Sequence, residues 1–218
     1  METEVKLAFK TAEEMFSIIE ADWFKHYCLD TSERKSVTLN NTYFDTPDRK
    51  LSARGGSIRV RHYGDDEDSN SYEHTVKFGG SVNNGLHQRY EWNYVTNSRK
   101  FKIDEFKRAV AESGDPADLL DEVLEGVNDD DIVPLASTVF ERTTYMFGYG
   151  DSIMEACFDL GKIEAAGKSE DICELELELE SGDVVDLKDI AQYIVENTDA
   201  VTFDDSKFKR CLRLIDNV

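Results

Sequence analysis

The chain has few cysteines and prolines, and it has no long apolar run. Its four cysteines, Cys28, Cys157, Cys173 and Cys211, form no CxxC pair, so neither a structural zinc site nor a redox motif is expected. Scattered cysteines of this kind are typical of buried thiols in a reducing compartment. No apolar run approaches the roughly 18 residues that a transmembrane helix needs, and no signal peptide is recognisable. We therefore expect a soluble, cytoplasmic protein that has no membrane partner.

Positive charge is also scarce. The 218 residues include 46 acidic residues but only 25 Lys and Arg, which gives a formal net charge of -21. A surface of this sign repels nucleic acid and anionic membranes, so we expect no nucleic-acid partner. A polyanionic small molecule would need a local pocket in which the sign of the charge is reversed.

Familiar catalytic motifs are absent as well. The sequence contains no Walker A motif and no Rossmann fingerprint, and the glycine-rich run 79–85 is interpreted as a flexible loop. The histidines, His26, His62, His74 and His87, have no surrounding motif that would indicate a Ser-His-Asp hydrolase. A hydrolase of the Ser-His-Asp type is therefore not supported.

The alternation of apolar and polar residues predicts a sheet with peripheral helices. Strands are expected at 2–9, 36–45, 57–64, 72–78, 86–95, 136–148, 152–162 and 172–180. Gly64 to Asn70 is interpreted as an acidic hairpin loop. The short connections favour antiparallel pairing, and the chain is expected to form one domain over residues 1–218.

Helical patterns occur near both ends of the chain and in its middle. A helix is predicted over 11–25, because Thr11 can act as its N-cap and Glu14 can complete a capping box. Two short helices, at about 103–112 and 116–125, are expected within an excursion from the sheet that spans about 96–135. The last two helices are predicted at 186–196 and 205–216.

Several predicted strands carry charge on one face and apolar residues on the other, since successive side chains point to opposite faces. Glu2, Glu4 and Lys6 share one face of the first strand. The last strand similarly aligns Glu174, Glu176 and Glu178, while the strands between them contribute Arg59, Arg61, Lys77, Arg89, Glu91, Arg142 and Asp159. Closure of the sheet into a barrel would remove its edges and enclose a lumen lined by charges of both signs.

A lumen of this composition suits a chain of phosphates and a divalent cation. Arginine offers planar, bidentate donors to phosphate oxygens, and carboxylates hold Mg²⁺ or Mn²⁺. Charge neutralisation and positioning account for most of phosphoryl-transfer catalysis. A bound metal also lowers the pKa of water, so no histidine or cysteine is required. The alternative interpretation is an ordinary sheet with one solvated polar face.

These residues resemble the CYTH domain superfamily, the triphosphate tunnel metalloenzymes. The ExExK motif of that family corresponds to Glu2-x-Glu4-x-Lys6. Further matching stretches follow in family order at 43–48, 56–61, 75–77, 85–91, 140–142, 158–161, 172–182 and 206–207. The resemblance covers nearly the whole chain, and stretches 85–89 and 172–182 are most similar to the bacterial inorganic triphosphatases.

The resemblance implies an α+β fold, an eight-stranded antiparallel closed β-barrel with peripheral helices that forms a triphosphate tunnel. It implies hydrolysis of inorganic triphosphate to pyrophosphate and phosphate with Mg²⁺ or Mn²⁺. The implied metal ligands are Glu2, Glu4, Asp159, Glu174, Glu176 and Glu178. The implied substrate ligands are Lys6, Arg59, Arg61, Lys77, Arg89, Arg142, Lys207 and Arg210. Catalytic roles are expected for Lys6, Arg59 and Glu91.

Some of these assignments have alternatives. Glu91 and Asp159 could instead orient neighbouring arginines, and Lys207 and Arg210 could either cap the tunnel or lie on a helix surface. The same fold could also serve a class IV-type adenylate cyclase or a thiamine triphosphatase. A different class of function is a non-catalytic module that binds polyphosphate or nucleotides, although the two carboxylate rows favour an enzyme. The sequence leaves the oligomeric state and the metal preference open.

Overall fold

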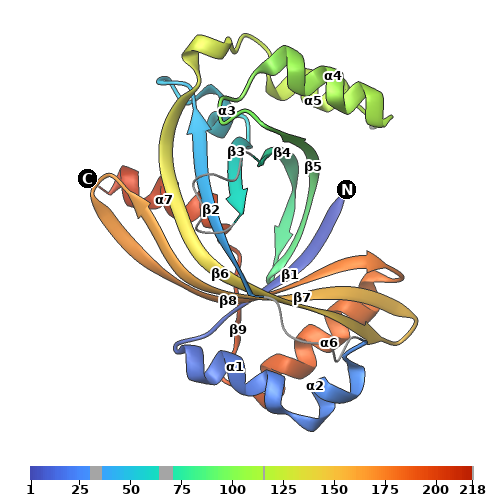
Figure 1. The fold of residues 1–218 in the computed structure, drawn as a ribbon. Coiled ribbons are helices and arrows are strands. Elements are labelled where there is room, and N and C mark those ends of the chain that lie inside the picture. The colour runs from blue at the N-terminus through green and yellow to red at the C-terminus, as the bar shows by residue number, and fades with distance from the viewer. Residues whose placement is uncertain (30–35, 64–70, 115, 218) are drawn as a thin grey trace.

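The computed structural model describes residues 1–29, 36–63, 71–114 and 116–217. Within these residues, eight long antiparallel strands form a closed barrel, and a ninth, short strand pairs with the first (Figure 1). The strand order is β5-β4-β3-β2-β6-β7-β8-β1-β9, and pairing of β5 with β1 closes the barrel. The strands are β1 Glu2–Ala8, β2 Ser36–Asp45, β3 Gly56–Tyr63, β4 Tyr72–Asn83, β5 Leu86–Thr96, β6 Val133–Tyr149, β7 Ser152–Ala165, β8 Lys168–Ser181 and β9 Val201–Thr202. The expected eight-stranded α+β barrel is thus confirmed.

The helices lie around this barrel. They are α1 Ala12–Glu20, α2 Asp22–Tyr27, α3 Lys50–Ala53, α4 Ile103–Ser113, α5 Asp118–Val123, the 3-10 turn η1 Asp129–Asp131, α6 Val184–Asn197 and α7 Lys207–Asp216. The Thr11 hydroxyl accepts a hydrogen bond from the backbone N–H of Glu14, as the capping motif predicted. The helix expected over 11–25 is divided in two, because Ala21 has an extended backbone between α1 and α2. In the described ranges, no helix has both the length and the apolar character needed to cross a membrane.

The helices bury the outer faces of the strands and so leave the lumen to charged side chains. Helices α1, α2 and α6 pack with Leu7 and Phe158 on one side of the barrel. Helices α4 and α5 pack with Ile58 and Trp92 on another side, which explains why the excursion after β5 stays attached to the sheet. Helix α7 differs, because its Cys211 packs with residues on the lumen-facing side of β6 and β7 and so occupies one end of the barrel.

The run 79–85 is not the flexible loop that its glycines suggested. Strand β4 continues to Asn83 through a bulge between Phe78 and Ser81. Gly80 has a φ of +91°, and a Cβ atom there would lie 1.8 Å from the carbonyl oxygen of Gln88 on β5. Only glycine fits this combination of backbone angle and close approach. The acidic hairpin loop expected at Gly64 to Asn70 lies outside the described residues.

Candidate functional site

The lumen contains a cavity of about 540 Å³, which is within the usual size range of ligand sites. Most of the charged residues that strand alternation had assigned to the lumen line this cavity. They are Glu2, Glu4, Lys6, Arg59, Arg61, Lys77, Arg89, Glu91, Arg142, Glu176 and Glu178, and α7 adds Lys207. Asp159, Glu174 and Arg210 are not in the lining, but they form ion pairs with one another or with residues that are.

Strand β1 carries the ExExK residues into the centre of this charged lumen. Glu4 and Lys6 are only 2% and 3% exposed, whereas Val5 packs in the apolar core on the other face. Pairing with β8 places Glu4 opposite Glu178 and Lys6 opposite Glu176. The face that alternation had defined is therefore enclosed, which excludes the alternative of a solvated sheet face at this position.

One part of the lumen has an excess of negative charge. Glu2 accepts hydrogen bonds from Lys77, with an Nζ–Oε1 distance of 2.7 Å, and from Arg89, with an Nε–Oε2 distance of 3.0 Å. Glu178, by contrast, forms no ion pair with any residue in the described part of the chain. Burial, followed by the nearby carboxylates of Glu2 and Glu4, raises the pKa of Glu178 to about 8. Such a carboxylate would be stabilised by a bound cation.

The facing wall, built from β3, has an excess of positive charge. Arg59 donates to Glu73 over 2.9 Å and to Thr75 over 2.8 Å, while its Nε is buried with no hydrogen-bond partner among the described residues. Burial, and then the guanidinium groups of Arg59 and Arg142, lowers the pKa of Arg61. An anion placed against these groups would relieve their mutual repulsion and satisfy the free donor.

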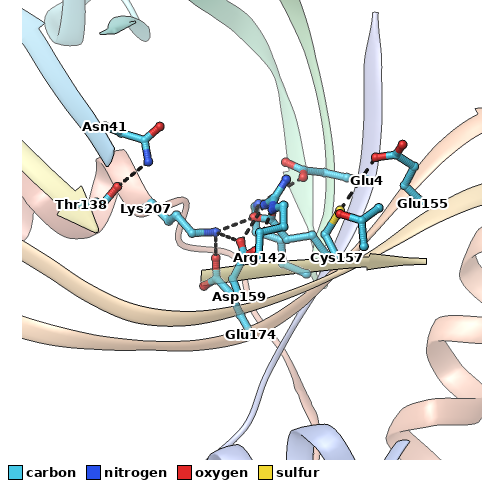
Figure 2. Close-up of polar contacts among 12 residues, drawn as sticks. Glu4, Asn41, Thr138, Arg142, Glu155, Cys157, Asp159, Glu174 and Lys207 are labelled. Atoms are coloured by element: carbon cyan, nitrogen blue, oxygen red, sulfur yellow. Dashed lines mark hydrogen bonds and ion pairs between the residues drawn. The ribbon is translucent and has the colours of Figure 1, made fainter. Parts of the chain in front are cut away.

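At the start of α7 lies a compact cluster in which the protein supplies its own counter-ions (Figure 2). Lys207, at the start of α7, donates to Asp159 over 2.6 Å and also contacts Glu174 and Glu176. Arg142 makes two hydrogen bonds to Asp159, of 2.7 and 2.6 Å. Burial alone would lower the pKa of Lys207, but these carboxylates raise it well above its ordinary value. Lys207 is thus held as a buried cation.

The remaining predicted residues, Glu91 and Arg210, contact other charged side chains in or beside the lumen. Glu91 forms an ion pair with Lys77 and accepts a hydrogen bond from Asn93 over 2.9 Å. Burial would raise the pKa of Glu91, but Lys77 and then Arg59 hold it below its ordinary range, so the carboxylate stays ionised. Arg210 is buried and donates to Glu174 over 3.0 Å, beside the cavity and outside its lining.

The CYTH domain family model matches residues 1–212 of this sequence. The chain belongs to the CYTH domain family. This CYTH domain is 30% identical over 178 residues to an inorganic triphosphatase of Haemophilus influenzae. The match covers 82% of this chain but 46% of that relative, so the chain spans about half of the relative's length.

Solved structures with low sequence identity share the fold of this CYTH domain. One is a Hippeastrum protein described as an adenylyl cyclase candidate with a dominant triphosphatase activity. It has a TM-score of 0.66 at 17% identity, with 99% of this chain and 97% of that chain covered. Another is a Bacillus halodurans protein described as an adenylate cyclase candidate, with a TM-score of 0.54, 18% identity and 96% of both chains covered. These likenesses concern the architecture.

Sequence reasoning missed two carboxylates that line the cavity of this CYTH domain. Glu73 lies on β4, on the same face as Lys77, and Glu155 lies on β7, on the same face as Asp159. The two-residue periodicity that located Lys77 and Asp159 also applies to these positions. The signal was therefore present, and Glu73 in particular contacts the predicted substrate ligand Arg59 directly.

Proposed function

We propose that this CYTH domain hydrolyses inorganic triphosphate to pyrophosphate and phosphate with the help of Mg²⁺ or Mn²⁺. The observation that carries the proposal is the pair of unbalanced charges in one cavity. Glu178, on one wall, forms no ion pair with a described residue, and on the other wall Arg59 and Arg61 share the single carboxylate of Glu73. A divalent cation and a phosphate chain would neutralise both at once. The similarity to an inorganic triphosphatase supports triphosphate as the substrate.

The residues present fit a hard divalent cation. Glu2, Glu4 and Glu178 offer carboxylate oxygens, the ligands that Mg²⁺ and Mn²⁺ prefer, and the raised pKa of Glu178 reflects a surplus of negative charge there. When bound, the cation supplies Lewis-acid charge beside the phosphates and lowers the pKa of water. Of the other candidate ligands, Asp159, Glu174 and Glu176 already contact Lys207. We therefore assign these three carboxylates to holding the ammonium group of Lys207 in place, and not to binding the metal.

The basic residues of the lumen would bind the non-bridging oxygens of the substrate. Lys6 lies between Glu4 and Glu176, whose carboxylates raise its pKa although burial lowers it. It can therefore donate to a phosphate next to the carboxylates. The other donors in this role are Arg59, Arg61, Lys77, Arg89 and Arg142. Because the strands hold these groups before substrate arrives, they stabilise charge in the transition state with little reorganisation.

The substitution Glu4→Gln tests this proposal. It removes one buried carboxylate from the cation-binding group without changing the size of the side chain, so metal-dependent release of phosphate from tripolyphosphate should be abolished. The matched control is Glu141→Gln, which alters an exposed glutamate on the outer face of β6. Turnover of Glu4→Gln at the rate of the unmodified protein would contradict the metal assignment.

The substrate is tested by a panel of phosphate-release assays. Tripolyphosphate, ATP, thiamine triphosphate and long-chain polyphosphate are compared with Mg²⁺ and with Mn²⁺, and formation of cyclic AMP from ATP is measured in parallel. We expect tripolyphosphate to give the highest kcat/KM. A cyclase would instead form cyclic AMP, and a binding module would bind these ligands with no turnover.

A further inference from the structure

The two arginines of β3 that face the lumen are held by different kinds of partner. Arg59 donates to the carboxylate of Glu73 over 2.9 Å. Arg61 donates through its Nε to the amide oxygen of Asn41, a neutral group, over 2.8 Å. Its ion pair within the described part of the chain is with Glu73 at 3.6 Å, and Arg59 contacts the same carboxylate oxygen. An amide oxygen orients a guanidinium group without neutralising it, whereas a carboxylate does both.

The other basic residues that we assign to phosphate lie closer to a carboxylate than Arg61 does. The nitrogen–oxygen distances are 3.1 Å from Lys6 to Glu4, 2.7 Å from Lys77 to Glu2, 3.0 Å from Arg89 to Glu2 and 2.6 Å from Arg142 to Asp159. Each of these cations is already paired before a ligand arrives. Among the described residues, the charge of Arg61 is therefore the least compensated of the set.

The side chain of Asn41 is fixed at both ends of its amide. Its Oδ1 accepts from Arg61, and its Nδ2 donates to the hydroxyl of Thr138 on β6 over 3.0 Å (Figure 2). Strand pairing sets this arrangement, since Asn41 on β2 lies opposite Arg61 on one side and opposite Thr138 on the other. Asn41 is 2% exposed, Thr138 is fully buried, and neither lines the cavity. Both can therefore act on a ligand only through Arg61.

We propose that Asn41 is a positioning residue that holds Arg61 toward the substrate and leaves its positive charge available to a phosphate group. This inference rests on the proposed function of the lumen as a triphosphate site. A carboxylate in place of the amide would bind Arg61 as an internal ion pair, and a phosphate would have to compete with it. An apolar side chain would leave the Nε donor of Arg61 without its acceptor, and the guanidinium would lose its fixed direction.

The substitution Asn41→Asp tests whether the neutrality of this position matters. Aspartate keeps the shape of the side chain and an oxygen toward Arg61, and the Thr138 hydroxyl can donate to its second oxygen, so a purely structural role would be preserved. We expect KM for tripolyphosphate to rise about tenfold or more, with a smaller fall in kcat, because a hydrogen bond to a charged group is worth about 1.5–3 kcal/mol. The matched control is Asn40→Asp, which adds the same charge on the outer face of β2, opposite Val139.

The substitution Asn41→Leu tests the direction of the guanidinium, because it removes the acceptor but adds no charge. We expect kcat to fall about tenfold with a smaller change in KM, since stabilisation of the transition state depends on donors that are already oriented. Thr138→Val removes the partner of the Asn41 amide and should act in the same direction but less strongly. Thr138→Ser, which keeps a hydroxyl group, should recover most of that loss.

The outcomes that would overturn this role are distinct. Unchanged KM and kcat in a folded Asn41→Asp protein would show that the charge at this position does not matter. Equal losses in Asn41→Asp and Asn40→Asp would show only a general effect of added negative charge. If circular dichroism shows that both Asn41 variants are unfolded, the two Thr138 variants decide, and equal activity of Thr138→Val and Thr138→Ser would refute the positioning role.

Calorimetric titration of the metal-free protein with tripolyphosphate separates this inference from the proposed function. If the unmodified protein binds tripolyphosphate without hydrolysing it, the proposed activity fails, and the dissociation constants still test Asn41. We expect binding to weaken about tenfold in Asn41→Asp and less than about threefold in Asn41→Leu, which keeps the charge of Arg61 uncompensated. Equal weakening in the two variants would show that Asn41 only fills space. No binding by the unmodified protein would overturn both proposals.

Discussion

Two carboxylate clusters lie close together on β7 and β8, yet their surroundings differ. The inner cluster consists of Asp159, Glu174 and Glu176, and the open cluster of Glu155, Glu178 and Glu180. All three members of the inner cluster contact Lys207, whereas Glu178 has no ion pair within the described part of the chain. Helix α7 brings its lysine to one cluster only. On β8, therefore, Glu176 already has a counter-charge in Lys207, whereas Glu178 has none among the described residues and is the better candidate for a cation.

Among substitutions that test the difference between the two clusters, Lys207→Met is expected to have the largest effect on the free energy of unfolding. Loss of the ammonium group leaves the buried inner cluster short of a cation, and an uncompensated buried charge typically costs about 3–5 kcal/mol of stability. Unfolding by urea, monitored by circular dichroism, measures the loss. Lys162→Met, at an exposed position, is the control. A change below about 1 kcal/mol would contradict the structural role of Lys207.

A second, smaller effect is expected from Glu178 and Glu176 on β8, which should influence the pH dependence of stability in opposite ways. The pKa of Glu178 is raised to about 8 by burial and then by Glu2 and Glu4, whereas in an unfolded chain it lies near the ordinary glutamate value of 4.5. Between these values the native state binds more protons than the unfolded state, so stability of the metal-free protein falls as pH rises. Glu178→Gln should remove this slope and raise stability at pH 8 by up to about 4 kcal/mol.

The same substitution at Glu176 should act in the opposite direction. Burial would raise the pKa of Glu176, but Lys207, Lys6 and Arg142 hold it well below its ordinary value. Its ionised form therefore stabilises the fold above about pH 4.5, the ordinary pKa of a glutamate, and Glu176→Gln should reduce stability at neutral pH. Urea unfolding between pH 5 and about 8 in the presence of a chelator, a range set by the two pKa shifts, measures both variants. Changes of the same sign would refute the distinction between the clusters.

Local pattern was sufficient to predict the strands and which of their faces carries charge, whereas the closed eight-stranded barrel came from the resemblance to the CYTH family. The alternation of Glu174, Glu176 and Glu178 with leucines specifies which face each side chain occupies, because this depends on strand geometry alone. The ExExK residues were placed correctly for the same reason. Glu73 and Glu155 obey the same rule and could have been predicted with them.

The division into two clusters could not be predicted in this way. It depends on where α7 docks, and that position is set by apolar contacts between Cys211 and residues on distant strands. The sequence alone was therefore compatible with Lys207 either on a helix surface or at the tunnel, and no local pattern distinguished the two positions. The run 79–85 shows a similar limit, since glycines with positive φ suit a loop or a bulge, and the facing strand determines which one forms.

The smallest effect concerns two arginines of α7 that share one partner. Arg210 donates to Glu170 over 2.7 Å and, with its side chain 5% exposed, reaches Glu174 in the inner cluster. Arg213 lies 3.1 Å from the same Glu170, but its side chain is 45% exposed. Because water screens an exposed ion pair, Arg213→Met should change the free energy of unfolding by less than about 1 kcal/mol.

Arg210→Met is the matched comparison for this last substitution, and urea unfolding of both variants in one buffer measures the difference. It should cost more than Arg213→Met, since it removes a cation from the buried carboxylate of Glu174. Added salt should diminish the effect of Arg213→Met and leave that of Arg210→Met nearly unchanged. Equal losses would mean that Lys207 alone neutralises the inner cluster, and Arg210 would then stabilise α7 only through its contacts with Glu170 and the backbone of Asp171.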